Sequence, residues 1–316
     1  MNVLVYKEQT KVTYSINEVI RLKEYWKIII DRNKNKLKIG VVAIVVTVGV
    51  IGIAIMGSHV KEEDQTEQAV KKYVETAVEA ADKTGPRYQP EPSAQTKIMQ
   101  NFQEYPSWII EYLQGHKEAI DWVADYPEEI QQDQQVIDEK ALRPIQLGSY
   151  YSDNGIPLLF QWDKKWGYAS YGDGVIAVEG CGPTCLSMVV IGLTSDTSMT
   201  PKMIADYSLD KGYYTEETGT DWNLMSEGAA GLGVYSVQIN EWSGKKIKDE
   251  LAAGHPMICS MGPGDFTVEG HFIVLTGVDE DGNIIVHDPN SKINSQKGWE
   301  VNTLLDQMKG MWAFSV

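Results

Sequence analysis

Hydrophobic residues are unevenly distributed along this 316-residue chain, and the longest uninterrupted apolar run lies near its start. Ile39 to Met56 form 18 consecutive positions without a charged side chain. This length approaches the ~20 residues that cross a bilayer as a helix, and a buried core helix of this length would usually carry a polar stripe. The pattern predicts a single transmembrane anchor over residues 39–57.

The charges on either side of this run predict its orientation. Residues 21–38 contain seven Lys or Arg, whereas residues 57–75 contain three. Because positive flanks stay in the cytoplasm, we expect residues 1–38 to form a cytoplasmic tail and the rest to lie outside the cell membrane. A cleaved signal peptide is disfavoured, since 38 residues precede the run and Ala54-Ile55-Met56 is a poor cleavage site. Within the tail, Ser15 to Glu18 have the spacing of a capping box, and a helix is expected over residues 19–30.

Three- and four-residue spacing of apolar side chains continues after the anchor. It predicts a stalk helix that ends at the Pro- and Gly-rich stretch of residues 84–92, so residues 58–92 are assigned to a stalk and linker. Residues 93–148 then read as a helical prelude, with short helices over residues 107–113 and 117–124. Its apolar residues are interpreted as core that packs on the following domain: Tyr105, Trp108, Ile109, Ile110, Tyr112 and Trp122. Alternatively, the whole segment covers a substrate groove as a propeptide does.

The pattern changes from helical to extended within residues 149–316, which predicts an α+β domain. Helices are expected to begin at Thr200-Pro201, at Thr220-Asp221 and, capped by Ser243, before Gly254. Strands are expected over residues 257–261, 272–278, 284–287 and 312–316. An antiparallel sheet with a helix packed against it is the expected architecture.

The first candidate for chemistry is Cys181, in the segment Gly180-Cys181-Gly182-Pro183. Pro183 suits the first turn of a helix, and apolar residues from Leu186 to Ile191 continue it. A thiol attacks as a thiolate, and the unpaired N–H groups of a helix N-terminus favour an anion. Cys181 is thus a candidate nucleophile.

Two residues far downstream complete this interpretation. His271 opens a strand, and residues 279–283 read as a hairpin turn, so the return strand would bring Asp288 back near His271. Alone, each residue has an ordinary structural explanation: a buried thiol, a strand-end histidine and an Asp-Pro turn. Their joint order favours a nucleophile, a base and a residue that orients the base.

At these residues the chain resembles the C-39-like cysteine peptidases, papain-like relatives of the peptidase domain on bacteriocin exporters. The resemblance spans roughly residues 156–316 and rests on four pieces: residues 156–163, 180–188, 270–278 and 287–289. It implies a papain-like fold with Cys181 as nucleophile, His271 as general base and Asp288 as its orienting partner. It also implies Gln161 as an oxyanion-stabilising side chain, although the glutamine of the exporter-linked peptidases lies only a few residues before the cysteine, and Gln161 lies 20 positions before Cys181.

The other two cysteines leave alternatives open. Cys181 and Cys185, with three residues between them, and the distant Cys259 do not give the paired ligand spacing of a structural zinc site, and a Cys-Cys-His set would need His271 as a ligand. A disulfide between Cys185 and Cys259 would form if the helix and the strand pack face to face, which would leave Cys181 as a free thiol.

The charge distribution narrows the choice of partners. Residues 1–38 hold nine Lys or Arg and four Asp or Glu, a net of +5, whereas residues 57–316 hold 19 and 40, a net of −21. A surface this acidic disfavours nucleic acid as a partner. It suits an extracellular domain that stays soluble, and it would attract basic substrates.

These observations predict a membrane-anchored extracytoplasmic cysteine peptidase that acts on peptide or protein substrates without metal or organic cofactor. Because an acyl-enzyme is common to several reactions, cell-wall peptide hydrolysis by an amidase or endopeptidase is an alternative. A papain-like surface binding module without turnover is another. Bacteriocin-leader cleavage coupled to export lacks support, since the chain has no phosphate-binding loop of a transporter ATPase. The sequence does not indicate an oligomeric state.

Overall fold

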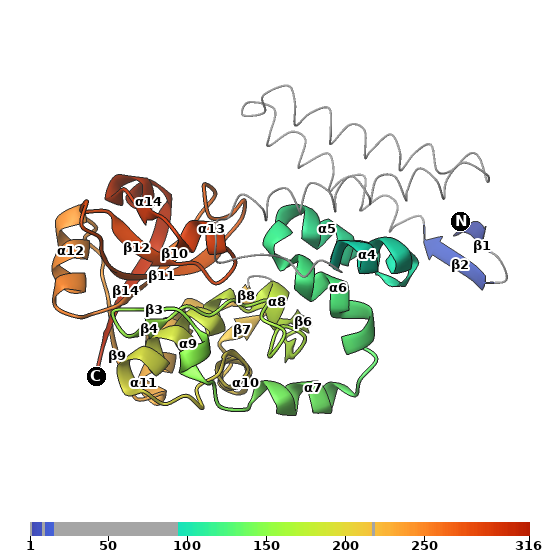
Figure 1. Ribbon diagram of the computed structural model, residues 1–316, viewed down its shortest axis with the longest axis horizontal. Coiled ribbons are helices and arrows are strands. Elements are labelled where there is room, and N and C mark those ends of the chain that lie inside the picture. The colour runs from blue at the N-terminus through green and yellow to red at the C-terminus, as the bar shows by residue number, and fades with distance from the viewer. Residues whose placement is uncertain (1, 8–9, 16–93, 217–218) are drawn as a thin grey trace, which may run out of the picture. The chain divides into compact units, whose positions relative to one another are not determined.

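The computed structural model describes residues 2–7, 10–15, 94–216 and 219–316 (Figure 1). These residues belong to two separate units. The first contains an antiparallel hairpin of β1 (Asn2–Lys7) and β2 (Thr10–Ser15), which no pattern in the sequence predicted. The predicted helix of residues 19–30, anchor of residues 39–57, and stalk and linker of residues 58–92 lie outside the described residues. None of the described helices combines the length and apolar character needed to cross a bilayer.

The second unit is organised around a six-stranded antiparallel sheet in the order β13-β12-β11-β10-β14-β9. The sequence predicted β10 and β12 with their observed bounds, and β11 begins one residue earlier than expected, at His271. β14 begins four residues earlier than predicted because Met308 to Met311 also pair with β10, across a shift in register. The strands are β9 (Tyr235–Gln238), β10 (Met257–Met261), β11 (His271–Val278), β12 (Ile284–His287), β13 (Gly298–Trp299) and β14 (Met308–Ser315).

The two faces of this sheet belong to different cores. Met257 and Cys259 point into a cluster that contains residues of α12 (Gly244–Ala252), whereas Ile258 between them points into the cluster that contains residues of α9 (Cys181–Thr194). This follows from the two-residue repeat of a strand. Cys185 of α9 lies in the cluster opposite to that of Cys259, so the sheet separates these two thiols and they form no disulfide; all three cysteines are free.

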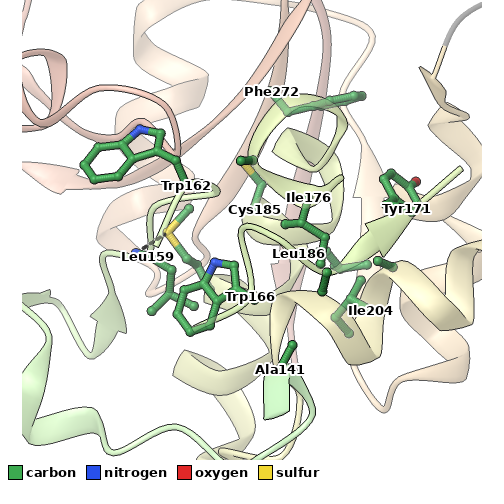
Figure 2. Packing of buried hydrophobic residues seen from close by; sticks show 14 of the residues in the cluster. Ala141, Leu159, Trp162, Trp166, Tyr171, Ile176, Cys185, Leu186, Ile204 and Phe272 are labelled. Atoms are coloured by element: carbon green, nitrogen blue, oxygen red, sulfur yellow. Dashed lines mark hydrogen bonds between the residues drawn. The ribbon is translucent and has the colours of Figure 1, made fainter. Parts of the chain in front are cut away.

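Helix α9 (Cys181–Thr194) is the central helix of the larger core and packs on β11. Every residue from Gly182 to Ile191 is buried, which explains why its sequence lacks a polar stripe. Figure 2 shows Cys185 and Leu186 of this helix among Ile176, Ile204 and Phe272. The helix ends at Ser195, whose left-handed backbone (φ 60°) closes the last turn.

The remaining helices of this domain follow the predicted caps with one change. Thr200 accepts a hydrogen bond from the N–H of Met203, and Ser243 accepts one from that of Lys246, as N-cap residues do. Asp221, however, caps a short 3-10 helix, η4 (Trp222–Met225), before α11 (Glu227–Gly231). The other helices are α8 (Ile176–Glu179), α10 (Pro201–Asp210), α12 (Gly244–Ala252), α13 (Lys292–Ser295) and α14 (Val301–Gln307).

Short hairpins and a 3-10 turn connect these elements. They are η3 (Leu147–Ser149), β3 (Ser152–Asp153) with β4 (Ile156–Pro157), β5 (Ser170–Tyr171) with β6 (Gly174–Val175), and β7 (Tyr214–Thr215) with β8 (Gly219–Thr220).

The prelude is helical, as predicted, and shares the larger core. Ile109 and Trp122 are fully buried in it, but Trp108, predicted as core, is 41% exposed, and its ring is nearly perpendicular to that of Tyr126. Pro127 was expected to follow the end of the second helix, but it lies inside α6 (Ile120–Glu129). The prelude comprises α4 (Ala94–Asn101), η1 (Phe102–Glu104), α5 (Ser107–Gly115), η2 (Lys117–Ala119), α6 (Ile120–Glu129) and α7 (Gln134–Ala141).

A buried lysine joins the prelude to the rest of this unit. The Lys202 ammonium on α10 lies 3.2 Å from Asp138 Oδ2 on α7 and 2.6 Å from Asp206 Oδ1. It also donates to the carbonyl and hydroxyl oxygens of Ser170 on β5. Three elements from separate parts of the sequence therefore meet at one cation.

Candidate active site

Cys181 is the first residue of α9, and the glycines on both sides of it are required by close approach. A Cβ atom on Gly180 would lie 2.5 Å from the carbonyl oxygen of Ile176, and one on Gly182 would lie 2.7 Å from Cγ2 of Thr220. Cys181 is partly exposed, whereas Cys185 and Cys259 are buried. Cys181 and Gly182 begin the helix, so their N–H groups have no i−4 carbonyl within it; Pro183 has no N–H, and that of Thr184 donates to the carbonyl oxygen of Gly180.

His271 contacts both of the other predicted residues. Its Nε2 lies 2.7 Å from Asp288 Oδ1, and Cys181 lies close enough to the imidazole to raise the pKa of His271. Because Asp288 occupies Nε2, Nδ1 is the ring nitrogen left for the sulfur. The structure thus brings Cys181, His271 and Asp288 together in the order thiol, imidazole, carboxylate.

The hairpin of β11 and β12 places Asp288 beside His271, as the sequence predicted. His287 pairs with Val274, and Asp288 follows at the end of β12. The Asp288 side chain is 1% exposed. Oδ1 also accepts a hydrogen bond from the backbone N–H of Asn290, and Oδ2 accepts one from the side-chain amide Nδ2 of Asn294. The backbone N–H of Asp288 donates a hydrogen bond to Oγ of Ser295. The carboxylate is therefore fixed on both oxygens.

These surroundings decide the charge of His271. Burial alone would lower its pKa, but the charge and hydrogen bond of Asp288, followed by those of Cys181, outweigh burial and raise the pKa to about 10. His271 is therefore an imidazolium at neutral pH. A positive charge beside the sulfur stabilises the thiolate form that nucleophilic attack requires.

Gln161 lies next to the same machinery, but its amide is engaged. Nε2 donates to the carbonyl oxygens of Ala177 at 2.7 Å and Val178 at 3.4 Å, both in α8 just before Cys181. The Gln161 N–H donates to the carbonyl of Pro289. Oε1 is buried without a hydrogen-bond partner. In this conformation the amide N–H groups point at α8, and an oxyanion role for Gln161 stays a prediction.

Several residues around Asp288 were missed by sequence reasoning. Asn290, Asn294 and Ser295 bind Asp288 directly, and Glu118 and His116 of the prelude bind the segment that follows it. The Asp288-Pro289-Asn290-Ser291 run is dense in turn-forming residues, which was the one local signal for this cluster. Glu118 and His116 carried no local signal, because their partners lie more than 170 residues away.

A pocket of about 460 Å³ lies beside this cluster. Trp122, Phe160, Trp162 and Lys292 are among its lining residues, and Cys181 is not. The Lys292 ammonium lies 4.8 Å from the centre of the Trp162 ring.

A thiol at the start of a buried helix, with an imidazole and a carboxylate on an antiparallel sheet, is the arrangement of papain-like cysteine peptidases. The model of the Peptidase_C39-like family matches residues 154–314. The chain belongs to this family and is a cysteine peptidase. The family assignment predicted from the sequence is confirmed.

Two further comparisons add detail. A crystal structure from Bacillus anthracis, titled as that of a candidate C39-like peptidase, is similar at 15% identity over 52% of this chain and 96% of that chain. The TM-score is 0.31. A search of curated proteins found no match.

Proposed function

We propose that this cysteine peptidase hydrolyses peptide bonds through Cys181, His271 and Asp288, on the outer side of a membrane to which residues 39–57 anchor it. The observation that carries the catalytic part is the 2.7 Å hydrogen bond between Asp288 and His271, with Cys181 near the same imidazole. Uncharged residues 39–56 and the excess of Lys and Arg before them support the location.

In the proposed reaction, the Cys181 sulfur attacks the carbonyl carbon of the substrate and the carbonyl π electrons move to its oxygen. The N–H groups at the start of α9 stabilise this oxyanion, with Gln161 as a further donor after its amide turns. The C–N bond then breaks, the leaving amine takes the proton of His271, and a thioester remains on Cys181. Neutral His271 next takes a proton from water, whose oxygen attacks the thioester carbonyl. The C–S bond breaks, the carboxylic acid product leaves, and the thiolate and the imidazolium are restored.

One labelling experiment tests both parts of the proposal. Cells that express the full chain would be treated with a sulfonated, membrane-impermeant maleimide at pH 6, and the three cysteines mapped by mass spectrometry. Because Cys185 and Cys259 are buried, Cys181 is the thiol that a folded protein presents. We expect Cys181 to react in intact cells at least roughly tenfold faster than in His271→Ala, which lacks the imidazolium.

The outcomes separate the two parts. Labelling of Cys181 only after lysis would contradict the outward orientation and leave the chemistry standing. A Cys181 that reacts no faster in the wild type than in His271→Ala would refute the catalytic assignment. Cys181→Ala, in which no label should appear at this position, is the specificity control.

A further inference from the structure

The prelude contacts the segment that follows Asp288, and these contacts give it a role beyond packing. We propose that Glu118 and His116 are positioning residues that hold Asp288 against His271, so that the prelude is part of the catalytic unit and not a removable covering segment. This inference rests on the proposed function of Cys181, His271 and Asp288.

Glu118 is a buried carboxylate that binds the start of α13. Glu118 is only 7% exposed to solvent. Oε1 accepts the hydroxyl of Ser291 at 2.7 Å, and Oε2 accepts the N–H groups of Lys292 at 2.7 Å and Ile293 at 3.3 Å. Helix α13 has only four residues, so most of its N-terminal N–H groups depend on such a partner. Glu118 therefore fixes where α13 begins.

The other end of α13 holds Asp288. Asn294 donates to Asp288 Oδ2 at 2.8 Å, and Ser295 Oγ accepts the Asp288 N–H at 2.9 Å. Ser291 links both ends, because its hydroxyl accepts the N–H of Asn294 while donating to Glu118. A displacement of α13 after loss of Glu118 would thus reach both the carboxylate and the backbone of Asp288.

His116 binds the same segment from the other side. Its Nδ1 lies 2.8 Å from Nδ2 of Asn290, whose backbone N–H donates to Asp288 Oδ1. An amide Nδ2 only donates, so His116 must be neutral and accept at Nδ1. Burial, followed by the positive charge of His271, lowers the pKa of His116 to about 4, in agreement with this role. The His116 ring also packs against that of Tyr112, with the ring centroids 4.3 Å apart and the planes tilted by 30°.

The charges around Glu118 argue against a role in packing alone. Burial, and to a smaller extent the nearby negative charge of Asp288, raise the pKa of Glu118 above its usual value. Lys292 is the cation of this segment, and it faces Asp121 and Asp163 as well as Glu118. Burying the Glu118 carboxylate near that of Asp288 costs free energy, so packing alone does not account for a glutamate at this position. Its three hydrogen bonds to one segment instead fix the position of that segment.

The test compares Glu118→Ala, Glu118→Gln and Glu111→Gln in the full chain, with iodoacetate alkylation of Cys181 followed from pH 5 to 11. Iodoacetate is an anion, so its reaction slows when the imidazolium of His271 loses its proton. Glutamine can still accept the N–H groups of Lys292 and Ile293 through its one oxygen. Glu111 is an exposed residue of α5 and serves as the matched control.

We expect Glu118→Ala to slow alkylation at neutral pH roughly tenfold to hundredfold. We also expect its fall at high pH to begin at a lower pH, because a displaced Asp288 no longer holds the proton on His271. Glu118→Gln should stay within about threefold of the wild type, and Glu111→Gln should match it. A loss of stability by itself would not move the pH at which the rate falls, so this shift identifies a positioning role.

Should Glu118→Ala fail to fold, His116→Phe provides the second variant, since it keeps an aromatic ring against Tyr112 and removes the Nδ1 atom that accepts from Asn290. A folded variant of either residue with the wild-type rate and pH profile would overturn the inference while leaving the proposed function intact. A wild-type Cys181 whose reactivity does not depend on His271 would overturn the proposed function and this inference with it.

Discussion

Lys202 offers the sharpest test of how the prelude is held to the rest of the unit. Its side chain is 4% exposed and joins Asp138 on α7, Asp206 on α10 and Ser170 on β5. In Lys202→Met the apolar stem and its packing are largely retained, and the charge and its hydrogen bonds are lost. The perturbation is therefore electrostatic.

The magnitude follows from what remains after the cation is removed. Breaking a fully buried ion pair by deleting one partner costs about 3–5 kcal/mol. Asp206 is 40% exposed and recovers water, and Asp138, 23% exposed, keeps its hydrogen bonds to the N–H and hydroxyl of Ser170. Both effects reduce the cost, so we expect a loss of about 2–3 kcal/mol in the free energy of unfolding.

Asp138 also sets the pH at which this loss should be measured. Burial would raise its pKa, but the hydrogen bonds from Ser170 and Gln134 and the charge of Lys202 lower it below the usual 3.8. A carboxylate with a lowered pKa stabilises the fold above its unfolded-state pKa, and this contribution is lost as the pH falls through the folded-state value. The difference between the wild type and Lys202→Met is thus complete at pH 7 and shrinks below about pH 4.

The assay is denaturant unfolding of the full chain in mild detergent, followed by tryptophan fluorescence at pH 7. Lys245→Met is the matched control, because Lys245 pairs with Asp249 at the surface, where the two side chains are 84% and 57% exposed. Such pairs contribute at most about 0.5 kcal/mol. If Lys202→Met and Lys245→Met were equally stable, the lysine would not join the prelude to the domain as argued.

Two further predictions concern the environment of Cys181. Gly180→Ala should slow alkylation of Cys181 more than roughly tenfold, since its Cβ would lie 2.5 Å from a backbone oxygen and must displace the start of α9. Gly115→Ala is the control, because nothing lies within 4 Å of the new atom. Equal alkylation rates in the two variants would contradict the steric argument. Iodoacetate alkylation of the wild type should persist well above neutral pH and fall only as the pH approaches about 10, because the pKa of His271 is raised to that value. Asp288→Asn should move this fall to lower pH. A fall near pH 6.5 in the wild type would show that the imidazolium is not stabilised.

The sequence by itself determined the features that local patterns encode. Alternating or continuous apolar runs predicted β10, β11 and β12 to within a residue, because each strand is buried and bounded by turn residues. The glycines around Cys181, with Pro183 after them, indicated a helix that begins at the thiol. Residues 156–163, 180–188, 270–278 and 287–289, taken together, predicted the family that the comparison confirmed. The predicted anchor of residues 39–57 likewise rests on sequence alone.

Only the tertiary structure decided what depends on partners distant in the sequence. The exposed strand β9 has no buried face to produce a pattern, and Trp108 lies at the surface although Ile109 beside it is in the core. The face of β10 to which Cys259 points, and so the absence of a bond to Cys185, depends on strand register. The contacts of Glu118 and His116 span more than 170 residues, and hydrogen bonds of that kind are specified by three-dimensional packing, which leaves no period or spacing in the chain.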